Sequence, residues 1–376
     1  MTIAPFGFAT AGTIRFGRGT VAEAAPFALA RAGRILVVRS ASVAAADALI
    51  VTLRNGAEVL EIVARGEPDL PGVLGDCDMA RPFAPELVLA IGGGAVIDHG
   101  KALAALLPAP HGPLRYLEVV GEGRPLDSPP LPVIAVPSTA GTGSEVTRNA
   151  VIQVPEAARK VSLRDPRLYP ALALVDPDLL ASCPREVMLA SGLDAVTQVI
   201  EPFVCRRATP MTDALCRDAI PRGLSALRRL MDRPDDVARE DMAFTSLAGG
   251  IALANAGLGA VHGLAGVIGG LTGAAHGAIC GTLLPEVLRL NRQRAPEGSP
   301  ERARLDWVIG CISDLHGDLD GFTGWARDLG LRRLTELGLS TEDHARVAAD
   351  ARGSSSYAAN PAELDDADLG EILARA

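Results

Sequence analysis

Short apolar runs alternate with helix-like stretches over the first half of the chain. The run RILVVRS (34–40) predicts a buried strand, and an alanine-rich helical pattern follows it. VLEIV (59–63), LVLAI (87–91) and LPVIAV (131–136) repeat this texture, and the last two each lead into a glycine-containing loop. Strands that alternate with helices predict a parallel, Rossmann-like sheet that is covered by helices on both faces.

The pattern changes after about residue 180. Pro184 begins a stretch whose apolar residues, from Leu189 to Phe203, recur at mixed three- and four-residue spacing. Helical patterns then continue to the C-terminus without a convincing strand. Because 376 residues exceed an ordinary single core, we predict an α/β domain at 1–181 and an all-α domain at 182–376.

Charge and composition exclude several classes of partner. The net charge of −9 and the absence of any run of basic residues argue against nucleic acid. The N-terminus lacks a basic segment followed by an apolar one, and no uninterrupted apolar run is long enough to span a bilayer, so we expect a cytoplasmic protein without a membrane partner. The six cysteines show no CxxC spacing and are expected to be small buried hydrophobes.

Two loops in the α/β half have the chemistry of a nucleotide site. Gly92, Gly93 and Gly94 stand between a strand and a helix, where the missing side chains and the helix N-terminus suit a pyrophosphate. The second loop, PSTAGTGSE (137–145), also follows a strand, so both loops should lie at the carboxyl edge of the sheet. The usual GxGxxG motif after the first strand is absent, which argues against an ordinary Rossmann dehydrogenase.

The helical half has the residues of a metal site. Asp194 and Gln198 are four residues apart and share a helix face, and His262 and His276 follow later in the chain. On one straight helix the two histidines would lie roughly 21 Å apart, so the glycines at 269, 270 and 273 would have to break it. A carboxylate and two imidazoles suit iron(II) or zinc, which would act as a Lewis acid.

The motifs GGGAVIDHGK and PSTAGTGSEVT, the Asp/His/His set and the closing NPAELDDADLGEILARA resemble those of the iron-containing (group III) alcohol dehydrogenase family. The resemblance covers essentially the whole chain. It implies the fold shared with dehydroquinate synthase, with a dinucleotide-binding domain and a helical metal- and substrate-binding domain. It also implies hydride transfer between NAD or NADP and a small alcohol, aldehyde or ketone, in a homodimer or larger homo-oligomer.

The resemblance also assigns residues. Both lysines of this chain, Lys101 and Lys160, match family positions on the cofactor side. The implied cofactor-binding residues are Ser40, Gly92, Gly93, Gly94, Asp98, Lys101, Ser138, Thr139, Thr142 and Lys160. The implied metal ligands are Asp194, Gln198, His262 and His276, and the implied catalytic residues are His276, His262 and Thr139.

The sequence departs from the family pattern at several positions, among them Ala95, which stands where the glycine motif of the family has a serine. Gln198 stands where the family has a ligand histidine, and Gly266 stands where many members have a further active-site histidine. Arg39 and Ser40 occupy the place of an aspartate that binds the adenosine ribose, which leaves NADP open, with Arg39 as the partner of its phosphate.

Three alternatives stay open, the first two because of these departures and the third because of the shared fold. The first is a metal-independent reductase of the maleylacetate reductase type, and the second is a nicotinamide-binding homologue that has lost catalysis. The third is an enzyme like dehydroquinate synthase, against which the short PSTAGTGSE loop and the C-terminal tail both argue.

Overall fold

The computed structural model describes residues 3–376, which form two compact units. One is Thr10–Cys183, and the other is Pro184–Ala376 together with the N-terminal residues up to Ala9. The N-terminal segment joins the helical unit through the side-chain amide of Asn255. This amide accepts from the Ala9 N–H at 2.7 Å and donates to the Ala9 carbonyl at 2.8 Å.

The first unit contains a six-stranded sheet in which every pairing is parallel. Its strands, in the order β1-β8-β5-β4-β2-β3, are β1 (Ile14–Phe16), β8 (Leu172–Val175), β5 (Val133–Pro137), β4 (Leu87–Gly92), β2 (Arg34–Ser40) and β3 (Glu58–Ala64). A separate antiparallel hairpin is formed by β6 (Asn149–Val154) and β7 (Arg159–Arg164).

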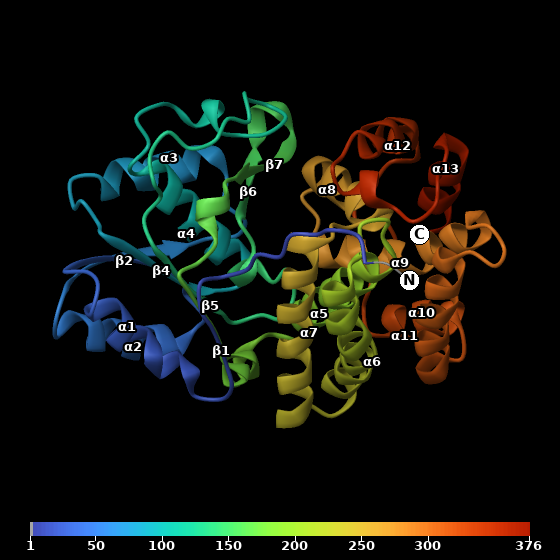
Figure 1. Cartoon of the computed structure of the whole chain (residues 1–376), viewed down its shortest axis with the longest axis horizontal. Helices are drawn as coiled ribbons and strands as arrows, with labels where there is room; N and C mark the ends of the chain where they lie inside the picture. Colours follow the sequence, from blue (N-terminus) through green and yellow to red (C-terminus); the bar gives the residue numbers. More distant parts are fainter. Residues whose placement is uncertain (1–2) are drawn as a thin grey trace. The chain divides into compact units, whose positions relative to one another are not determined.

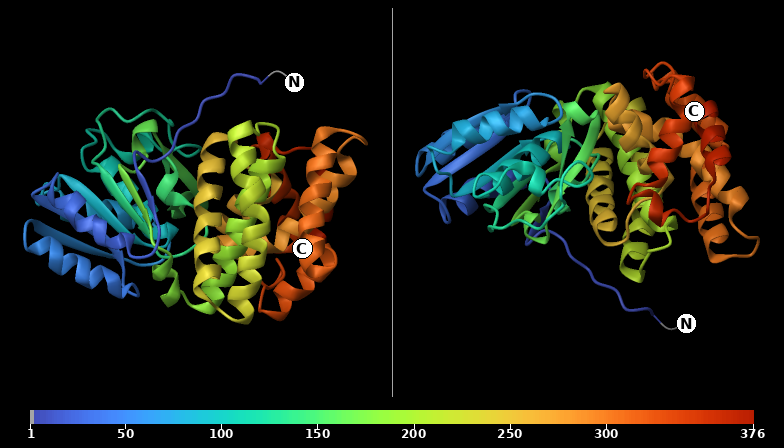
Figure 2. Two further views of the ribbon diagram at one scale, coloured as in Figure 1. Left: turned by 60° about the horizontal axis from the view of Figure 1, so that its bottom comes forward. Right: turned by 90° about the horizontal axis from the view of Figure 1, so that it is seen from above.

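Helices cover both faces of this sheet, as the sequence predicted (Figures 1 and 2). Helices α1 (Ala24–Leu29) and α2 (Ala44–Arg54) pack on one face, and α3 (Leu70–Ala80) and α4 (Gly94–Leu106) pack on the other. Alternate residues of β4 point into the two cores, and all six are buried. A strand with two apolar faces is stable only between two helical layers, which explains its uninterrupted hydrophobic sequence.

The second unit is helical throughout its described residues, apart from loops and short 3₁₀ turns. Its α-helices are α5 (Arg185–Val204), α6 (Pro210–Asp232), α7 (Asp236–Asn255), α8 (Ala260–Thr272), α9 (His276–Arg294), α10 (Pro300–His316), α11 (Leu319–Asp328), α12 (His344–Arg352) and α13 (Asp366–Arg375).

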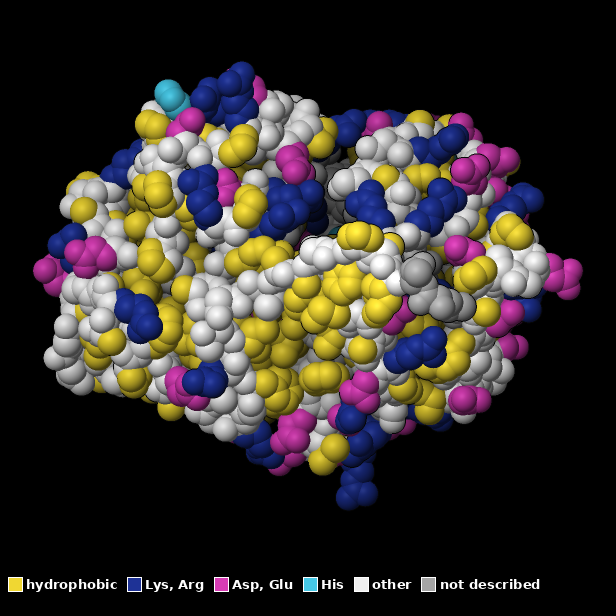
Figure 3. Space-filling view, in the orientation of Figure 1, with side chains coloured by type: hydrophobic (Ala, Val, Ile, Leu, Met, Phe, Trp, Pro, Cys, Tyr) yellow, Lys and Arg dark blue, Asp and Glu magenta, His cyan; other side chains and the backbone are white. Residues whose placement is uncertain are grey.

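Helix α5 is the central helix of this unit and contacts α6, α7, α9 and α10. It is long and apolar enough to cross a membrane by length and composition, as are α7 and α8 taken together despite a 98° bend between them. However, 83% of the apolar window of α5 is buried inside the protein, and the helix contains Asp194 and Glu201. Its hydrophobicity is therefore that of a core helix. Acidic and basic side chains are interspersed on the face drawn in Figure 3.

Candidate active site

The two glycine-containing loops meet at the carboxyl edge of the sheet. Strands β4 and β5 are neighbours, with Gly92 opposite Pro137, and the Ser138 N–H donates to the Gly92 carbonyl at 2.8 Å. Each loop follows its strand directly, so adjacent parallel strands bring them together, as the sequence predicted.

Glycines allow the second loop to approach the first. A Cβ atom on Gly94 would lie 2.3 Å from Thr142 Oγ1, and one on Gly93 would lie 3.3 Å from Thr139 Oγ1. Helix α4 begins at Gly94, so its first N–H groups lack intrahelical acceptors at this point. The result is a pair of loops with threonine hydroxyls beside a helix N-terminus, an arrangement that suits a phosphate group.

Asp98 and Lys101 fasten these loops together. Lys101 is fully buried, and its ammonium donates to the Ser144 carbonyl at 2.9 Å and to Thr147 Oγ1 at 3.2 Å. It also lies 3.2 Å from Asp98 Oδ1, which accepts a 2.5 Å hydrogen bond from the Ser144 hydroxyl. Burial lowers the pKa of Lys101, and the Asp98 carboxylate opposes that shift. The polar atoms of both residues thus hold the second loop against α4.

The other predicted cofactor residues lie on different strands. Ser40 ends β2 and shares a 2.9 Å hydrogen bond with the Ser42 hydroxyl. Lys160 lies on β7, and its ammonium pairs with Glu67.

Three residues of the helical unit converge from three helices. Asp194 Oδ1 on α5 lies 3.3 Å from His262 Nε2 on α8 and 3.8 Å from His276 Nε2 on α9. The two imidazole rings are 5.4 Å apart between centroids. The predicted Asp/His/His set is therefore brought together.

A break between α8 and α9 makes this convergence possible. Helix α8 ends at Thr272 and is followed by Gly273, which has a φ of +68°, a left-handed conformation that favours glycine. Gly269 and Gly270 remain inside α8, so only one of the three glycines expected at the break lies there. On α9, a Cβ atom at Gly277 would lie 2.1 Å from the Ala190 carbonyl oxygen of α5. Gly277 thus lets the start of α9 approach α5 and places His276 beside Asp194.

Glu201 orients His262 and was missed by sequence reasoning. Its Oε2 lies 2.7 Å from His262 Nδ1, and its Oε1 accepts a hydrogen bond from the Val261 N–H at 2.7 Å. Glu201 follows Asp194 by seven residues, two helical turns, which places both carboxylates on the same face of α5. That spacing is the sequence feature that points to it.

Cys280 is a second residue that the sequence reasoning missed. Asp194, His262, His276 and Cys280 each offer one donor atom, and these atoms all lie within 4.8 Å of one another. Cys280 follows His276 by four residues and so shares its helix face. The expectation that it is only a small buried hydrophobe is therefore incomplete. Gln198, the predicted fourth ligand, is buried on α5 one turn after Asp194.

The chemistry of this cluster fits a divalent cation. Asp194 Oδ1 and His262 Nε2 are buried and have no hydrogen-bond partner among the described residues. Burial would raise the pKa of Asp194, but His262 and the groups beside it lower it. Burial would likewise lower the pKa of His262, but its acidic neighbours, Cys280 first, raise it well above its usual value. The donors therefore form an electronegative site, and buried polar atoms of this kind need a partner.

Gly266, where many members of the family have a further histidine, lies in open space, since a Cβ atom added there would meet nothing within 4 Å.

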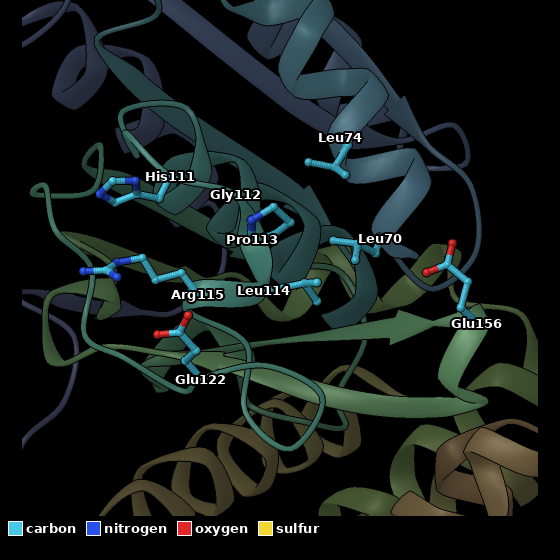
Figure 4. A pocket seen from close by; sticks show the side chains of 9 residues that line it. All are labelled: Leu70, Leu74, His111, Gly112, Pro113, Leu114, Arg115, Glu122 and Glu156. Atoms are coloured by element: carbon cyan, nitrogen blue, oxygen red, sulfur yellow. The ribbon is translucent and has the colours of Figure 1, made fainter.

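A separate open pocket of about 560 Å³ lies on the α/β unit (Figure 4). Leu70 and Leu74 of α3 line it together with residues of the segment from His111 to Glu122. None of the predicted site residues lines this pocket.

Comparison with known proteins relates both halves of the chain to one family. Residues 11–177 match the iron-containing alcohol dehydrogenase family, and residues 188–376 match the C-terminal domain of the same family. Alcohol dehydrogenase 4 of Saccharomyces cerevisiae is 32% identical over 82% of this chain and 80% of its own length.

Two solved structures are similar over nearly the whole chain. A 1,3-propanediol oxidoreductase has a TM-score of 0.88 at 27% identity and covers 99% of both chains. Sulfoacetaldehyde reductase from Bifidobacterium kashiwanohense, solved with NAD⁺, has a TM-score of 0.84 at 27% identity and covers 99% of this chain and 98% of its own. By sequence and by fold, this chain belongs to the iron-containing alcohol dehydrogenase family and is an oxidoreductase of the alcohol dehydrogenase class.

Proposed function

We propose that this enzyme transfers hydride between NAD and a small aliphatic alcohol or aldehyde, with a divalent metal held by Asp194, His262 and His276. The observation that carries the proposal is the convergence of these three side chains, with two buried donor atoms that have no hydrogen-bond partner in the part of the chain that the structure describes. A metal bound there would supply Lewis acidity toward the alcohol or carbonyl oxygen.

The α/β unit is the proposed cofactor domain. The first N–H groups of α4 and the hydroxyls of Thr139 and Thr142 lie at the junction of the two loops, where the Ser138 N–H also bonds to the Gly92 carbonyl. A pyrophosphate gains both hydrogen bonds and the helix dipole at such a position. Lys101 contributes indirectly, because its ammonium holds the second loop in place.

We propose NAD rather than NADP as the physiological cofactor. The Arg39 guanidinium pairs with Glu61 at 2.5 Å and with Asp47 at 3.0 Å, so two carboxylates already neutralise the group expected to bind a 2′-phosphate. The similar sulfoacetaldehyde reductase was solved with NAD⁺. Because Arg39 is already paired, the preference for NAD predicts that Arg39→Ala leaves the KM for NADPH unchanged within about twofold. A selective rise in that KM of about tenfold or more would show that Arg39 binds the phosphate.

Glu201 and Thr139 have distinct proposed roles. Because His262 Nδ1 faces the Glu201 carboxylate, Nδ1 keeps a proton, and Nε2, beside Asp194, is the nitrogen that would hold the metal. Thr139 Oγ1 is half-buried beside Gly93 and is the proposed proton-transfer hydroxyl. On this proposal Thr139→Val lowers kcat more than NADH affinity, and Thr139→Ser retains most activity.

The proposed substrates follow from the relatives. An alcohol dehydrogenase, a 1,3-propanediol oxidoreductase and a sulfoacetaldehyde reductase are named for small alcohols or aldehydes. A panel of short primary alcohols, diols and aldehydes, assayed by NADH absorbance, is the direct test. A cytoplasmic location and assembly into a homodimer or larger oligomer stay predictions.

Metal analysis separates this proposal from a metal-independent reductase of the maleylacetate reductase type. Protein expressed with supplementary iron and zinc should contain close to one metal per chain. His276→Ala should lose most of it, whereas His344→Ala, which removes a histidine outside the cluster, should not. A metal-free wild type that still reduces carbonyl compounds with NADH would refute the metal site. Turnover no faster than that of Asp194→Asn would instead indicate a homologue without catalysis.

A further inference from the structure

We propose that Cys280 is the fourth protein ligand of the metal, and that its sulfur makes the site selective for zinc over iron(II). The inference rests on the proposed Asp194/His262/His276 metal site and adds a ligand that neither the family motifs nor the sequence pattern assigns.

The separations between the donor atoms fit a tetrahedral ion. Zinc bonds of about 2.0–2.2 Å to nitrogen or oxygen and about 2.3 Å to sulfur place tetrahedral donors roughly 3.4–3.6 Å apart. Asp194 Oδ1 lies 3.3 Å from His262 Nε2 and 3.8 Å from His276 Nε2. Cys280 Sγ lies 3.7 Å from His276 Nε2. These three separations are close to those of one coordination sphere, and all four donor atoms lie within 4.8 Å of one another.

Helix geometry holds the sulfur at this position. His276 begins α9, and Cys280 lies one turn later on the same face. Gly277 and Gly281 flank that face and pack against α5, where a Cβ atom would lie 2.1 Å from the Ala190 carbonyl oxygen and 2.6 Å from Leu193 Cδ1, respectively. The close approach of the two helices therefore aims Cys280 toward Asp194. Cys280 is fully buried, so solvent does not compete for its sulfur.

A sulfur donor changes which metal is preferred. Soft thiolate ligands favour zinc and copper(I), whereas an oxygen-rich site suits harder ions. The amide oxygen of Gln198 is a weaker donor to a transition metal than a thiolate is. Gln198 on α5 stands where the family has a ligand histidine. The sulfur of Cys280, which lies on α9, therefore compensates for the weaker donor.

Cobalt(II) substitution tests the ligand directly, because a cobalt–thiolate bond produces an intense near-ultraviolet charge-transfer band that oxygen and nitrogen ligands do not. The full-length apoprotein is titrated with cobalt(II) alone and its spectrum recorded. We expect this band in the wild type and in Cys311→Ser, a control that removes a half-buried cysteine outside the cluster. In Cys280→Ser the band should disappear while the visible bands of bound cobalt remain.

Zinc competition gives a second readout. Cys280→Ser should bind zinc about 10–100-fold more weakly than the wild type, since even the loss of an outer-shell partner costs that much. Its affinity for iron(II), measured by the same competition, should fall less, and an equal loss of both affinities would overturn the selectivity. Wild-type cobalt protein with visible bands but no charge-transfer band would overturn the role of Cys280 and leave the three-residue site intact. Failure of the wild type to bind cobalt or zinc would overturn both the role of Cys280 and the three-residue metal site. Because the wild-type spectrum decides the question, the test does not depend on the folding of a variant.

Discussion

Glu145 carries a pH-dependent cost to the stability of the α/β unit. It lies in the short turn Ser144–Val146 at the end of the second glycine-containing loop, and it is only 2% exposed. Burial raises the pKa of this carboxyl to about 7, although its own backbone N–H and the ammonium of Lys101 act in the opposite direction. At neutral pH the folded chain therefore holds a carboxyl group that is only partly ionised, whereas the unfolded chain ionises it fully.

The size and direction of the effect follow from linkage. A shift from the ordinary value of 4.5 to about 7 corresponds to about 3 kcal/mol, at 1.36 kcal/mol per pH unit. Because the pKa of Glu145 is raised in the folded state, its protonated carboxyl contributes fully to stability below pH 4.5. This stabilising contribution is lost as pH rises through about 7. Glu145→Gln cannot ionise, so its stability relative to the wild type should increase with pH.

Urea unfolding of the full chain, followed by far-ultraviolet circular dichroism, measures this difference. The stability of Glu145→Gln relative to the wild type should rise by about 2–3 kcal/mol between about pH 5 and about pH 8. Glu156→Gln removes an exposed carboxylate from the same unit and should show no comparable change with pH. A difference for Glu145→Gln that stays constant over this range would refute the argument from burial.

Four further outcomes follow from the site geometry. Gly94→Ala places a Cβ atom 2.3 Å from Thr142 Oγ1, so NADH affinity, measured by fluorescence titration, should fall by about tenfold or more while the melting temperature changes little. Gly277→Ala places a Cβ atom 2.1 Å from the Ala190 carbonyl oxygen; it should lower stability by about 1–3 kcal/mol and reduce metal per chain. Glu201→Gln should weaken zinc binding by roughly 10–100-fold without loss of helix content by circular dichroism. Dialysis against a strong chelator should abolish turnover but not NADH binding, and added metal should restore it; turnover that survives complete metal removal would contradict the proposed mechanism.

Most of the α/β fold could be predicted because its physical cause is local. A parallel strand buried on both faces requires an uninterrupted apolar run, and β2, β4 and β5 have one. Strand β1 was missed because it has only three residues and none is buried. The hairpin of β6 and β7 was also missed, although residues along β6 alternate between half-buried and buried, a period-two pattern typical of a half-exposed strand.

The site was less predictable where its geometry depends on contacts between distant segments. The family resemblance placed Lys101 among the cofactor-binding residues, but only the fold shows that its ammonium donates hydrogen bonds to Ser144 and Thr147. Glycine spacing suggested a helix break before His276 without fixing its place. That place is set by the left-handed Gly273 and by the close contact of Gly277 with α5.

Each histidine of the cluster is fixed by a contact that is independent of a metal. Glu201 fixes the ring of His262 through Nδ1 and accepts from the Val261 N–H, which ties α8 to α5. His276 is placed by the glycine contact at the start of α9. Because neither contact needs the ion, the donors are held close together before it binds, and its binding energy is not spent on folding the helices. On the proposed role of Cys280, the same argument explains how a sulfur from α9 serves a site whose carboxylate comes from α5. The position of a donor in space, set by helix packing, matters more than the helix that supplies it.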